Sequence, residues 1–528
     1  MHRRLGTRLL RSAAAWLSLA LVAPAWAYTN VKVNTFANFP EECTIAVHPI
    51  NPNIVLGGAQ ATGSRYYLST NGGASWGDNL LPGQFNLGDP ALTFDADGNA
   101  YFAYIGTFNH SGIYVNKSTD GGLTWKANAT PVIEHASGAP FEDKEWPVCD
   151  WNTGARHGWL YIAWTQFDDY GSADPADSSR ILFARSTNGG ASFGAPVRIS
   201  DRGGDAVDSD NTVEGCMPAV GVDGTIYCAW AGPRGIEFDR STNGGVSFGV
   251  DRVISDQPGG WDFPIPGIYR CNGLPVTKVD LSNGPHRGRV YVHWADKRNG
   301  DYDCFLIYSD NGGTTWSARK RINDDPLGNG KDQFFSWIDV DPTTGTVYAV
   351  FYDRRGQSGV ATDVYFAYSQ DGGDHWVNEK VSATPFTPNE SVFFGDYIGI
   401  SAFAGRIRTL WMRLDGNDLS LWTALIDRTT EAPPTIELPL AGTWLASGLL
   451  VAPNPIRFGA QIRAVRSEFS PQAAVVADVT GRVVRRLPFD GARSVRWDGR
   501  SAEGMTVAAG VYFVSADGGP ATRVVIVR

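Results

Sequence analysis

Short runs of alternating apolar and polar residues fill most of this 528-residue chain, and helical periodicity is nearly absent after the first 27 residues. Six runs commonly read Gly-x-x-Tyr-x-x-aromatic, at 53–59, 100–105, 159–164, 225–230, 289–294 and 346–351. Other short apolar runs flank each of them, separated by Gly, Pro, Asn or Asp. Alternation with a period of two, interrupted by such residues, predicts strands joined by tight turns. We therefore predict an all-β protein.

One eight-residue motif, Ser-x-Asn/Asp-Gly-Gly-x-x-aromatic, occurs six times. Its Asn or Asp can bond the backbone of the turn and its two glycines accept positive φ, so each copy predicts a hairpin whose aromatic residue anchors the next strand. The third positions are Asn71, Asp120, Asn188, Asn243, Asn311 and Asp371. The spacing is 49 residues from Ser69 to Ser118 and 68 from Ser118 to Ser186. Such a period fits four short strands per unit and predicts a β-propeller.

The motif resembles the Asp box, or BNR repeat, of the sialidase-like β-propeller superfamily. The resemblance implies that the boxes are structural hairpins on the face away from the active site. A seventh three-strand pattern, at 396–403, 406–412 and 419–426, has no box and no fourth strand. The alternating segment 30–34 can supply that strand, so we favour seven blades. Six blades, the number in sialidases, is the alternative.

The two ends of the chain have different compositions from the propeller region at 28–430. Residues 1–27 combine arginines, an apolar run and the sequence Ala25-Trp26-Ala27, which is typical of a signal peptide. We therefore expect a protein that is secreted or held on the outer surface of a bacterium. A Pro-containing linker is predicted at 431–448 and a small immunoglobulin-like β-sandwich at 449–528.

The last segment resembles the FlgD-like immunoglobulin fold and the C-terminal sorting domains of type IX secretion cargo. The residues concerned are Val451–Pro455, Val479–Arg485, Trp497–Arg500 and Gly510–Phe513. The resemblance implies that the outer-membrane secretion machinery is a partner. An accessory β-sandwich without a sorting role is the alternative.

The net charge bears on the partners of the protein, and the cysteines bear on its disulfides. Asp and Glu number 55 against 45 Lys and Arg, a net charge of -10, which disfavours nucleic acid as a partner. Export permits disulfides among Cys43, Cys149, Cys216, Cys228, Cys271 and Cys304. We predict that Cys271 is bridged to Cys216 or Cys304, because all three fall near strand ends on one face.

Acidic residues begin the first strand of most units, on the face opposite the hairpin motifs. The candidate catalytic residues there are Asp89, Glu145, Glu214, Asp332 and Asp396. Glycoside hydrolysis uses such paired carboxylates. Residues of neighbouring connections are candidates for substrate binding: Asp296, Arg298, Asp353, Arg355, Arg234 and Trp261. Arginine can clamp a carboxylate sugar and an indole can stack on a sugar face. Solvated ion pairs and loop caps are the alternative.

One motif expected of a sialidase is missing from this sequence. The family resemblance implies an arginine in an Arg-Ile-Pro motif at the first blade, but the matching segment, 39–45, carries Glu41 and Glu42 instead. This departure disfavours a classical exo-sialidase.

The connection at 201–214 holds Asp205, Asp208 and Asp210, which could bind calcium, although a merely acidic loop is favoured. No other cofactor is expected.

Three classes of function remain open from the sequence. The first is processing of extracellular glycans by acids at the channel mouth. The second is binding of an extracellular glycan or glycoprotein without turnover. The third is a structural role at the cell surface.

Overall fold

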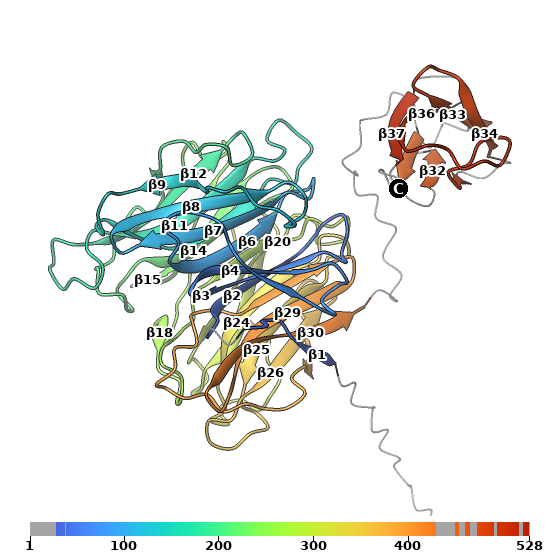
Figure 1. The fold of residues 1–528 in the computed structure, drawn as a ribbon. Coiled ribbons are helices and arrows are strands. Elements are labelled where there is room, and N and C mark those ends of the chain that lie inside the picture. Colours follow the sequence, from blue (N-terminus) through green and yellow to red (C-terminus); the bar gives the residue numbers. More distant parts are fainter. Residues whose placement is uncertain are drawn as a thin grey trace, which may run out of the picture.

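The computed structural model describes residues 28–36, 39–428, 449–452, 460–464, 472–489, 494–516 and 521–526. Within these ranges every regular element is a β-strand, which confirms the all-β prediction (Figure 1). A helix with the length and apolar character needed to cross a membrane is absent from the same ranges. The predicted signal peptide and the predicted linker both lie outside the described residues.

Six antiparallel sheets each contain four strands in chain order. They are β2 (Glu41–Val47), β3 (Val55–Ala61), β4 (Gly63–Ser69) and β5 (Gly77–Leu80); β6 (Gly88–Phe94), β7 (Ala100–Thr107), β8 (His110–Ser118) and β9 (Thr130–Glu134); β10 (Phe141–Cys149), β11 (Leu160–Phe167), β12 (Ser179–Ser186) and β13 (Val197–Arg198); β14 (Glu214–Val220), β15 (Ile226–Gly232), β16 (Gly235–Ser241) and β17 (Arg252–Ser255); β20 (Val276–Val279), β21 (Val290–Asp296), β22 (Asp303–Ser309) and β23 (Lys320–Arg321); and β24 (Gln333–Val340), β25 (Val347–Asp353), β26 (Asp363–Ser369) and β27 (Val377–Lys380). A short hairpin, β18 (Asp262–Phe263) and β19 (Cys271–Asn272), lies between the fourth and fifth sheets in the chain.

A seventh sheet joins the two ends of this region. It consists of β28 (Gly399–Phe403), β29 (Arg406–Asp415) and β30 (Asp418–Asp427), with β1 (Thr29–Lys32) as the fourth strand. β1 runs antiparallel to β30, with Thr29 opposite Leu425 and Lys32 opposite Trp422 (Figure 1). The prediction that the segment 30–34 supplies the missing strand beside 419–426 is confirmed. It leaves β30 with a partner on each side, so no long strand edge is exposed there.

The first strands of the seven sheets pack against one another in a closed cycle. β2 contacts β6 and β28, and the cycle continues through β10, β14, β20 and β24 back to β28. Buried aromatic and aliphatic side chains fill the spaces between neighbouring sheets, among them Trp164, Trp230 and Trp294. This closed order of sheets is the architecture of a β-propeller.

The six copies of the Ser-x-Asn/Asp-Gly-Gly motif lie between the third and fourth strands of their sheets, as predicted. In the second sheet, the Ser118 hydroxyl accepts a 2.8 Å hydrogen bond from the N–H of Gly122 and donates to Asp120 at 2.7 Å. The other five copies repeat the bond from the glycine N–H to the serine hydroxyl. Both glycines have positive φ, 75° and 93° in this copy. The predicted hairpins are confirmed.

The described strands near the C-terminus form two further sheets. One contains β31 (Leu449–Ala452), β32 (Ala460–Ala464) and β35 (Ser494–Trp497); the other contains β33 (Ala473–Asp478), β34 (Val483–Pro488), β36 (Gly510–Ala516) and β37 (Ala521–Ile526). Their buried cluster, which includes Leu449, Val476 and Trp497, shares no residue with the clusters of the seven sheets. This part of the chain therefore has a hydrophobic core of its own.

Candidate functional site

A β-bulge marks the start of the first strand in most sheets. The strand register shifts between Glu41 and Thr44, and at the matching position in four other sheets. The residue in each bulge has positive φ, although four of these residues are not glycine: Glu42 (53°), Asp89 (51°), Lys144 (52°) and Phe335 (46°). Such conformations cost about 1–3 kcal/mol each and persist where the surroundings enforce them. Bulges redirect side chains, and here the redirected groups include charged ones.

Ion pairs link these bulges across the ring. Lys144 pairs with Asp396, and its Nζ lies 3.8 Å from Oδ2 of Asp89. Arg270 also contacts Asp396, with a 2.8 Å hydrogen bond from Nε to Oδ1. Burial opposes ionisation of Asp396, but the ammonium of Lys144 and the guanidinium of Arg270 together hold its pKa well below the ordinary value. Asp396 is therefore an ionised carboxylate at neutral pH.

Several carboxyl groups beside this network have no such partners. Glu145 is 1% exposed, and neither of its carboxyl oxygens has a hydrogen-bond partner in the described part of the chain. One oxygen each of Glu42 and Glu214 is in the same condition, and Oδ2 of Asp89 has no hydrogen bond although Nζ of Lys144 lies 3.8 Å away. Burial raises the pKa of Glu145 well above its usual value, and the negative charge of Asp89 raises it further. An unpaired buried carboxyl group is costly, which makes this cluster a candidate site.

A pocket opens beside these groups and has aromatic side chains in its wall. Asp89, Glu145 and Asp396 line it together with Trp146, Trp337 and Tyr397. The centroids of the two indoles are 4.6 Å apart, and the Tyr397 ring lies 5.7 and 5.9 Å from them. Trp146 and Trp337 also line a second cavity, which is bounded by the first strands of the sheets. The two indoles therefore lie between the acidic pocket and this second cavity.

Four of the five candidate catalytic residues lie in this region. Asp89, Glu145 and Asp396 line the pocket. Glu214 is buried nearby, and after desolvation the charges of Asp208 and Asp143 contribute most to its raised pKa. Asp332 lies elsewhere: its Oδ1 accepts a 3.2 Å hydrogen bond from the N–H of Tyr302, and it does not line the pocket.

The candidate substrate-binding residues form ion pairs inside the protein. Asp296 is fully buried, accepts a 2.7 Å hydrogen bond from the Trp294 indole and pairs with Arg298. Asp353 is equally buried and lies 2.8 Å from Nε of Arg355. These carboxylates are therefore not exposed at the surface, and each one anchors an arginine two residues further along the chain.

The other two members of that set are also engaged or buried. Arg234 pairs with the buried Glu237. Trp261 is 6% exposed and packs among hydrophobic residues between the fourth and fifth sheets, so its indole face is covered. None of the six candidate substrate-binding residues lines the pocket of Glu145.

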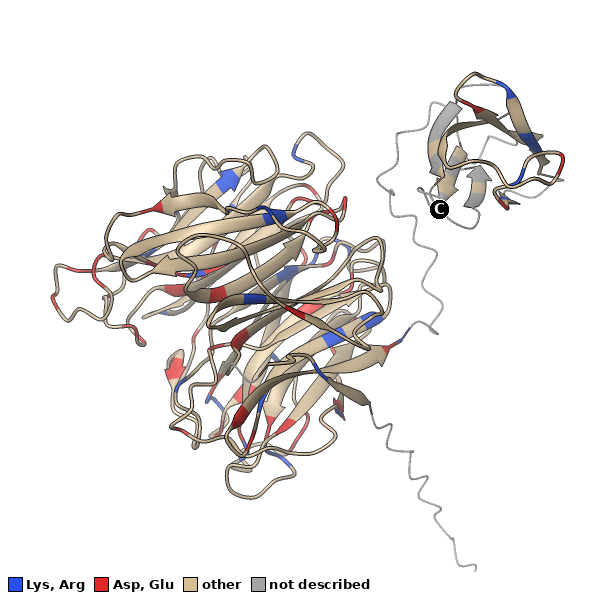
Figure 2. Cartoon of the chain, in the orientation of Figure 1, with Lys and Arg blue, Asp and Glu red and all other residues tan. Residues whose placement is uncertain are grey.

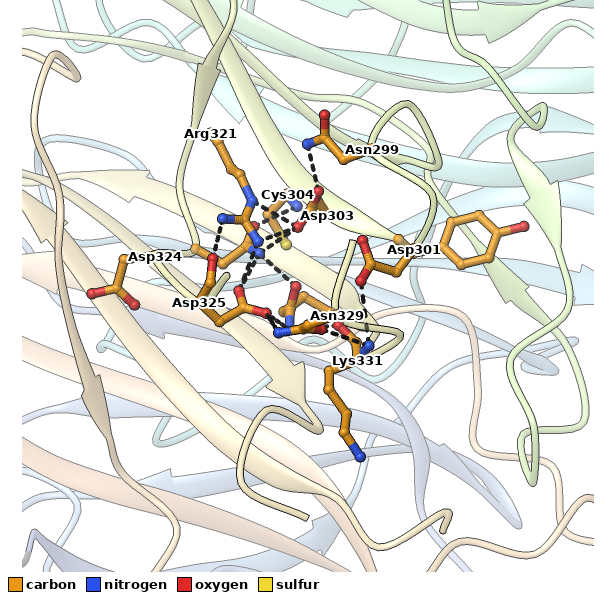
Figure 3. Close-up of polar contacts among 12 residues, drawn as sticks. Asn299, Asp301, Asp303, Cys304, Arg321, Asp324, Asp325, Asn329 and Lys331 are labelled. Carbon is orange, nitrogen blue, oxygen red and sulfur yellow. Dashed lines mark hydrogen bonds and ion pairs between the residues drawn. The ribbon is translucent and has the colours of Figure 1, made fainter. Parts of the chain in front are cut away.

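A second polar cluster, in the fifth and sixth sheets, contrasts with the pocket. Figure 3 shows Arg321 reaching both Asp303 and Asp325, at 2.7 and 2.8 Å. The amide of Asn329 donates to Asp325 at 2.8 Å, and that of Asn299 donates to Asp303 at 2.6 Å. Because donors already surround these carboxylates, the cluster holds its connections together. Acidic residues lie on strands as well as in loops of the seven sheets (Figure 2).

The acidic connection at 201–214, for which calcium binding is the less favoured interpretation, contacts the ion-pair network through Asp208. Asp208 accepts a hydrogen bond from Tyr170 and lies 3.6 Å from Arg270. Asp205 accepts bonds from its own loop, and Asp210 accepts a 2.9 Å bond from the N–H of Asp262. The described residues contain no group of three His, Cys, Asp or Glu side chains arranged to hold a metal ion. Calcium binding at this connection therefore gains no support from the structure.

All six cysteines are buried and free. The prediction that Cys271 is bridged to Cys216 or Cys304 is wrong. Cys271 lies on β19, Cys216 on β14 and Cys304 on β22, and each thiol is packed within the propeller. Their common position near strand ends did not bring the sulfur atoms into bonding contact.

Sequence reasoning missed two indoles that line the pocket, Trp146 and Trp337, and it missed Arg270, which contacts the pocket residue Asp396. The indoles could have been found from the register of the first strands. Trp146 stands two residues after the bulge residue Lys144, and Trp337 stands two residues after Phe335. Arg270 lies in the connection between β18 and β19, for which the repeat offers no equivalent position.

No family model matches the chain. Solved structures similar to it include the lectin BP39L from Burkholderia pseudomallei, at 14% identity and TM-score 0.46, covering 73% of this chain and 96% of the lectin. An ulvan lyase bound to a saccharide gives 12% identity and TM-score 0.46 over 76% of this chain and 96% of the lyase. A Hadza microbial sialidase gives 13% identity and TM-score 0.39 over 71% and 74%. At this level of similarity they do not decide the function of this chain.

Proposed function

We propose that this protein recognises extracellular glycans through the pocket beside Glu145, at the mouth of a seven-bladed propeller. The observation that carries the proposal is the combination of three clustered aromatic rings with buried carboxylates that have unused acceptor oxygens. Aromatic rings stack on the apolar faces of sugars, and carboxylate oxygens accept hydrogen bonds from hydroxyl groups. The well-paired charges elsewhere on the face offer neither feature.

The cellular setting is part of the same proposal. Residues 1–27 act as a signal peptide, and the segment 449–528 directs the protein to the outer-membrane secretion machinery. Support for this comes from the sequence patterns of both segments and from the separate hydrophobic core of the C-terminal strands. The protein then acts outside the cell, where glycans and glycoproteins are accessible.

Hydrolysis of a glycosidic bond is a second candidate function, favoured by a specific observation. Desolvation and Asp89 raise the pKa of Glu145, whereas Lys144 and Arg270 lower that of Asp396. A protonated and an ionised carboxyl group in one pocket correspond to the acid and base of glycoside hydrolysis. In this version Glu145 donates the proton to the leaving oxygen.

An array of neutral, acidic and amino glycans, probed with the exported protein, tests the proposal. We expect retention of at least one glycan class, and loss of retention in Trp337→Leu, because the ring is part of the pocket wall. Phe108→Leu is the control, since Phe108 is an exposed aromatic residue outside the pocket. Failure to retain any glycan would overturn the proposal. Release of sugar from a retained glycan would favour hydrolysis over binding.

A further inference from the structure

The pocket and its surroundings contain more buried acidic groups than cations. Asp89, Glu145 and Asp396 line the pocket, and Glu42, Asp143 and Glu214 are buried around it. The cations in contact with this set are Lys144 and Arg270. Both pair with Asp396, and Nζ of Lys144 also lies 3.8 Å from Oδ2 of Asp89. The remaining carboxyl groups therefore face a shortage of positive charge. A buried carboxylate is stabilised when a cation with hydrogen-bond donors comes into contact with it.

Glu145 shows this shortage most clearly. Both of its oxygens are buried without a hydrogen-bond donor, and its side chain borders the pocket. Oδ2 of Asp89, which lines the same pocket, also has no hydrogen bond, although Nζ of Lys144 lies 3.8 Å from it. The two oxygens of Glu145 therefore have no partner, and Oδ2 of Asp89 is a third acceptor in the same pocket wall. A primary ammonium group has three N–H donors and matches such a set.

The aromatic wall suits the same kind of ligand. The ammonium group of Lys144 already lies 5.4 Å from the centroid of the Tyr397 ring, which demonstrates that this ring accepts a cation in its present environment. Trp146 and Trp337 border the pocket beside it. Indole is the side chain that attracts cations most strongly through its ring face.

We propose that the pocket binds the free primary amine of an amino sugar. The inference rests on the proposed glycan recognition and specifies the charge of the ligand. An N–H-bearing ammonium is favoured over a quaternary one, because the unpaired oxygens need donors. An acidic sugar is disfavoured, because the arginine beside the pocket, Arg270, is already paired with Asp396. A metal ion is disfavoured by the absence of a suitable ligand group among the described residues.

The test is a calorimetric titration of the exported protein with two matched ligands. One is a glucosamine oligomer with free amines, and the other is the same oligomer after N-acetylation, which removes the positive charge and keeps the sugar backbone. We expect the free-amine oligomer to bind at least about tenfold more tightly. Glu145→Gln should weaken its binding by about tenfold and leave the acetylated oligomer almost unaffected. Glu390→Gln, which removes the same charge from an exposed loop, should change neither.

The outcomes separate this inference from the proposed function. Equal or tighter binding of the acetylated oligomer would overturn the preference for an amine and leave glycan recognition intact. The proposed amine site would also be overturned if the Glu145→Gln and Asp89→Asn variants both bound the free-amine oligomer as tightly as the unmodified protein. The amine would then lie elsewhere. Thermal unfolding of each variant establishes that it is folded. If neither oligomer nor any glycan of the array bound, the proposed function itself would fail.

Discussion

The ammonium group of Lys144 forms an ion pair with the carboxylate of Asp396, although 252 residues separate them in the sequence. Lys144 lies on the first strand of the third sheet, and Asp396 lies just before the first strand of the seventh. Lys144 has positive φ in its bulge, so the backbone turns its side chain toward the mouth of the ring. The pocket thus depends on closure of the ring by the seventh sheet.

Replacing Lys144 with methionine should lower the free energy of unfolding by about 3–5 kcal/mol, because it removes one of the two cations that compensate the buried Asp396. Urea unfolding followed by tryptophan fluorescence measures this. The control is Lys32→Met, since the pair of Lys32 with Asp418 is exposed and should be worth about 0–1 kcal/mol. Equal losses in the two variants would contradict the assigned role of the buried pair.

Gly122→Ala should destabilise the propeller by about 1–3 kcal/mol and leave glycan affinity unchanged. The residue has φ of 93°, and a Cβ there would meet Leu56 Cδ2 at 2.5 Å. Gly154→Ala is the matched control, because a Cβ at Gly154 meets no atom within 4 Å. Differential scanning calorimetry and a binding titration check both halves of the prediction. A selective loss of binding would show that the hairpin face contributes to the site.

Asp296→Ala should cost about 3–5 kcal/mol of stability, because it leaves the Trp294 indole and Arg298 without their buried acceptor. Asp256→Ala serves as the control: Asp256 contacts the same arginine at 3.3 Å, but its side chain is largely exposed. Chemical denaturation of both variants measures the difference. A fully stable Asp296→Ala protein with altered glycan binding would restore the interpretation of Asp296 as a ligand contact.

Stability should fall as the pH rises from about 4.5 to about 7. Burial, reinforced by Asp396, raises the pKa of Glu41 from 4.5 to about 7, so in this window the folded state binds more protons than the unfolded state. The lowered pKa of Asp396 acts in the opposite sense, and its contribution is lost only at more acidic pH. Urea unfolding at several pH values should show that the free energy of unfolding of the Glu41→Gln variant declines less steeply with rising pH than that of the unmodified protein. If the free energy of unfolding had the same pH dependence in the unmodified protein and in Glu41→Gln, the raised pKa assigned to Glu41 would be contradicted.

The sequence predicted the sheets and hairpins well because both depend on local chemistry. Alternation defined the strands, and the glycine pair in each motif defined a turn that no other residue type adopts easily. The pairing of β1 with β30 also followed from alternation together with the missing fourth strand.

The site was harder to predict because it depends on contacts between distant sheets. The acidic starts of the first strands indicated the correct face, and Asp89, Glu145 and Asp396 do meet there. Asp296 and Asp353 carry the same charge and lie on the same face at the ends of the second strands β21 and β25, yet each is paired with a nearby arginine. Sequence spacing does not distinguish a carboxylate with a partner from one without. That distinction depends on burial and on neighbours such as Arg270, which are far away in the chain.

The most direct test of the account is a crystal structure of the exported protein with a glycan that the array retains. We predict electron density for a sugar residue in contact with both Glu145 and Trp337, in the pocket that Asp89 and Asp396 also line. Density for the glycan on the hairpin face, or on the connections that carry Arg298 and Arg355, with the pocket of Glu145 empty, would contradict the central claim.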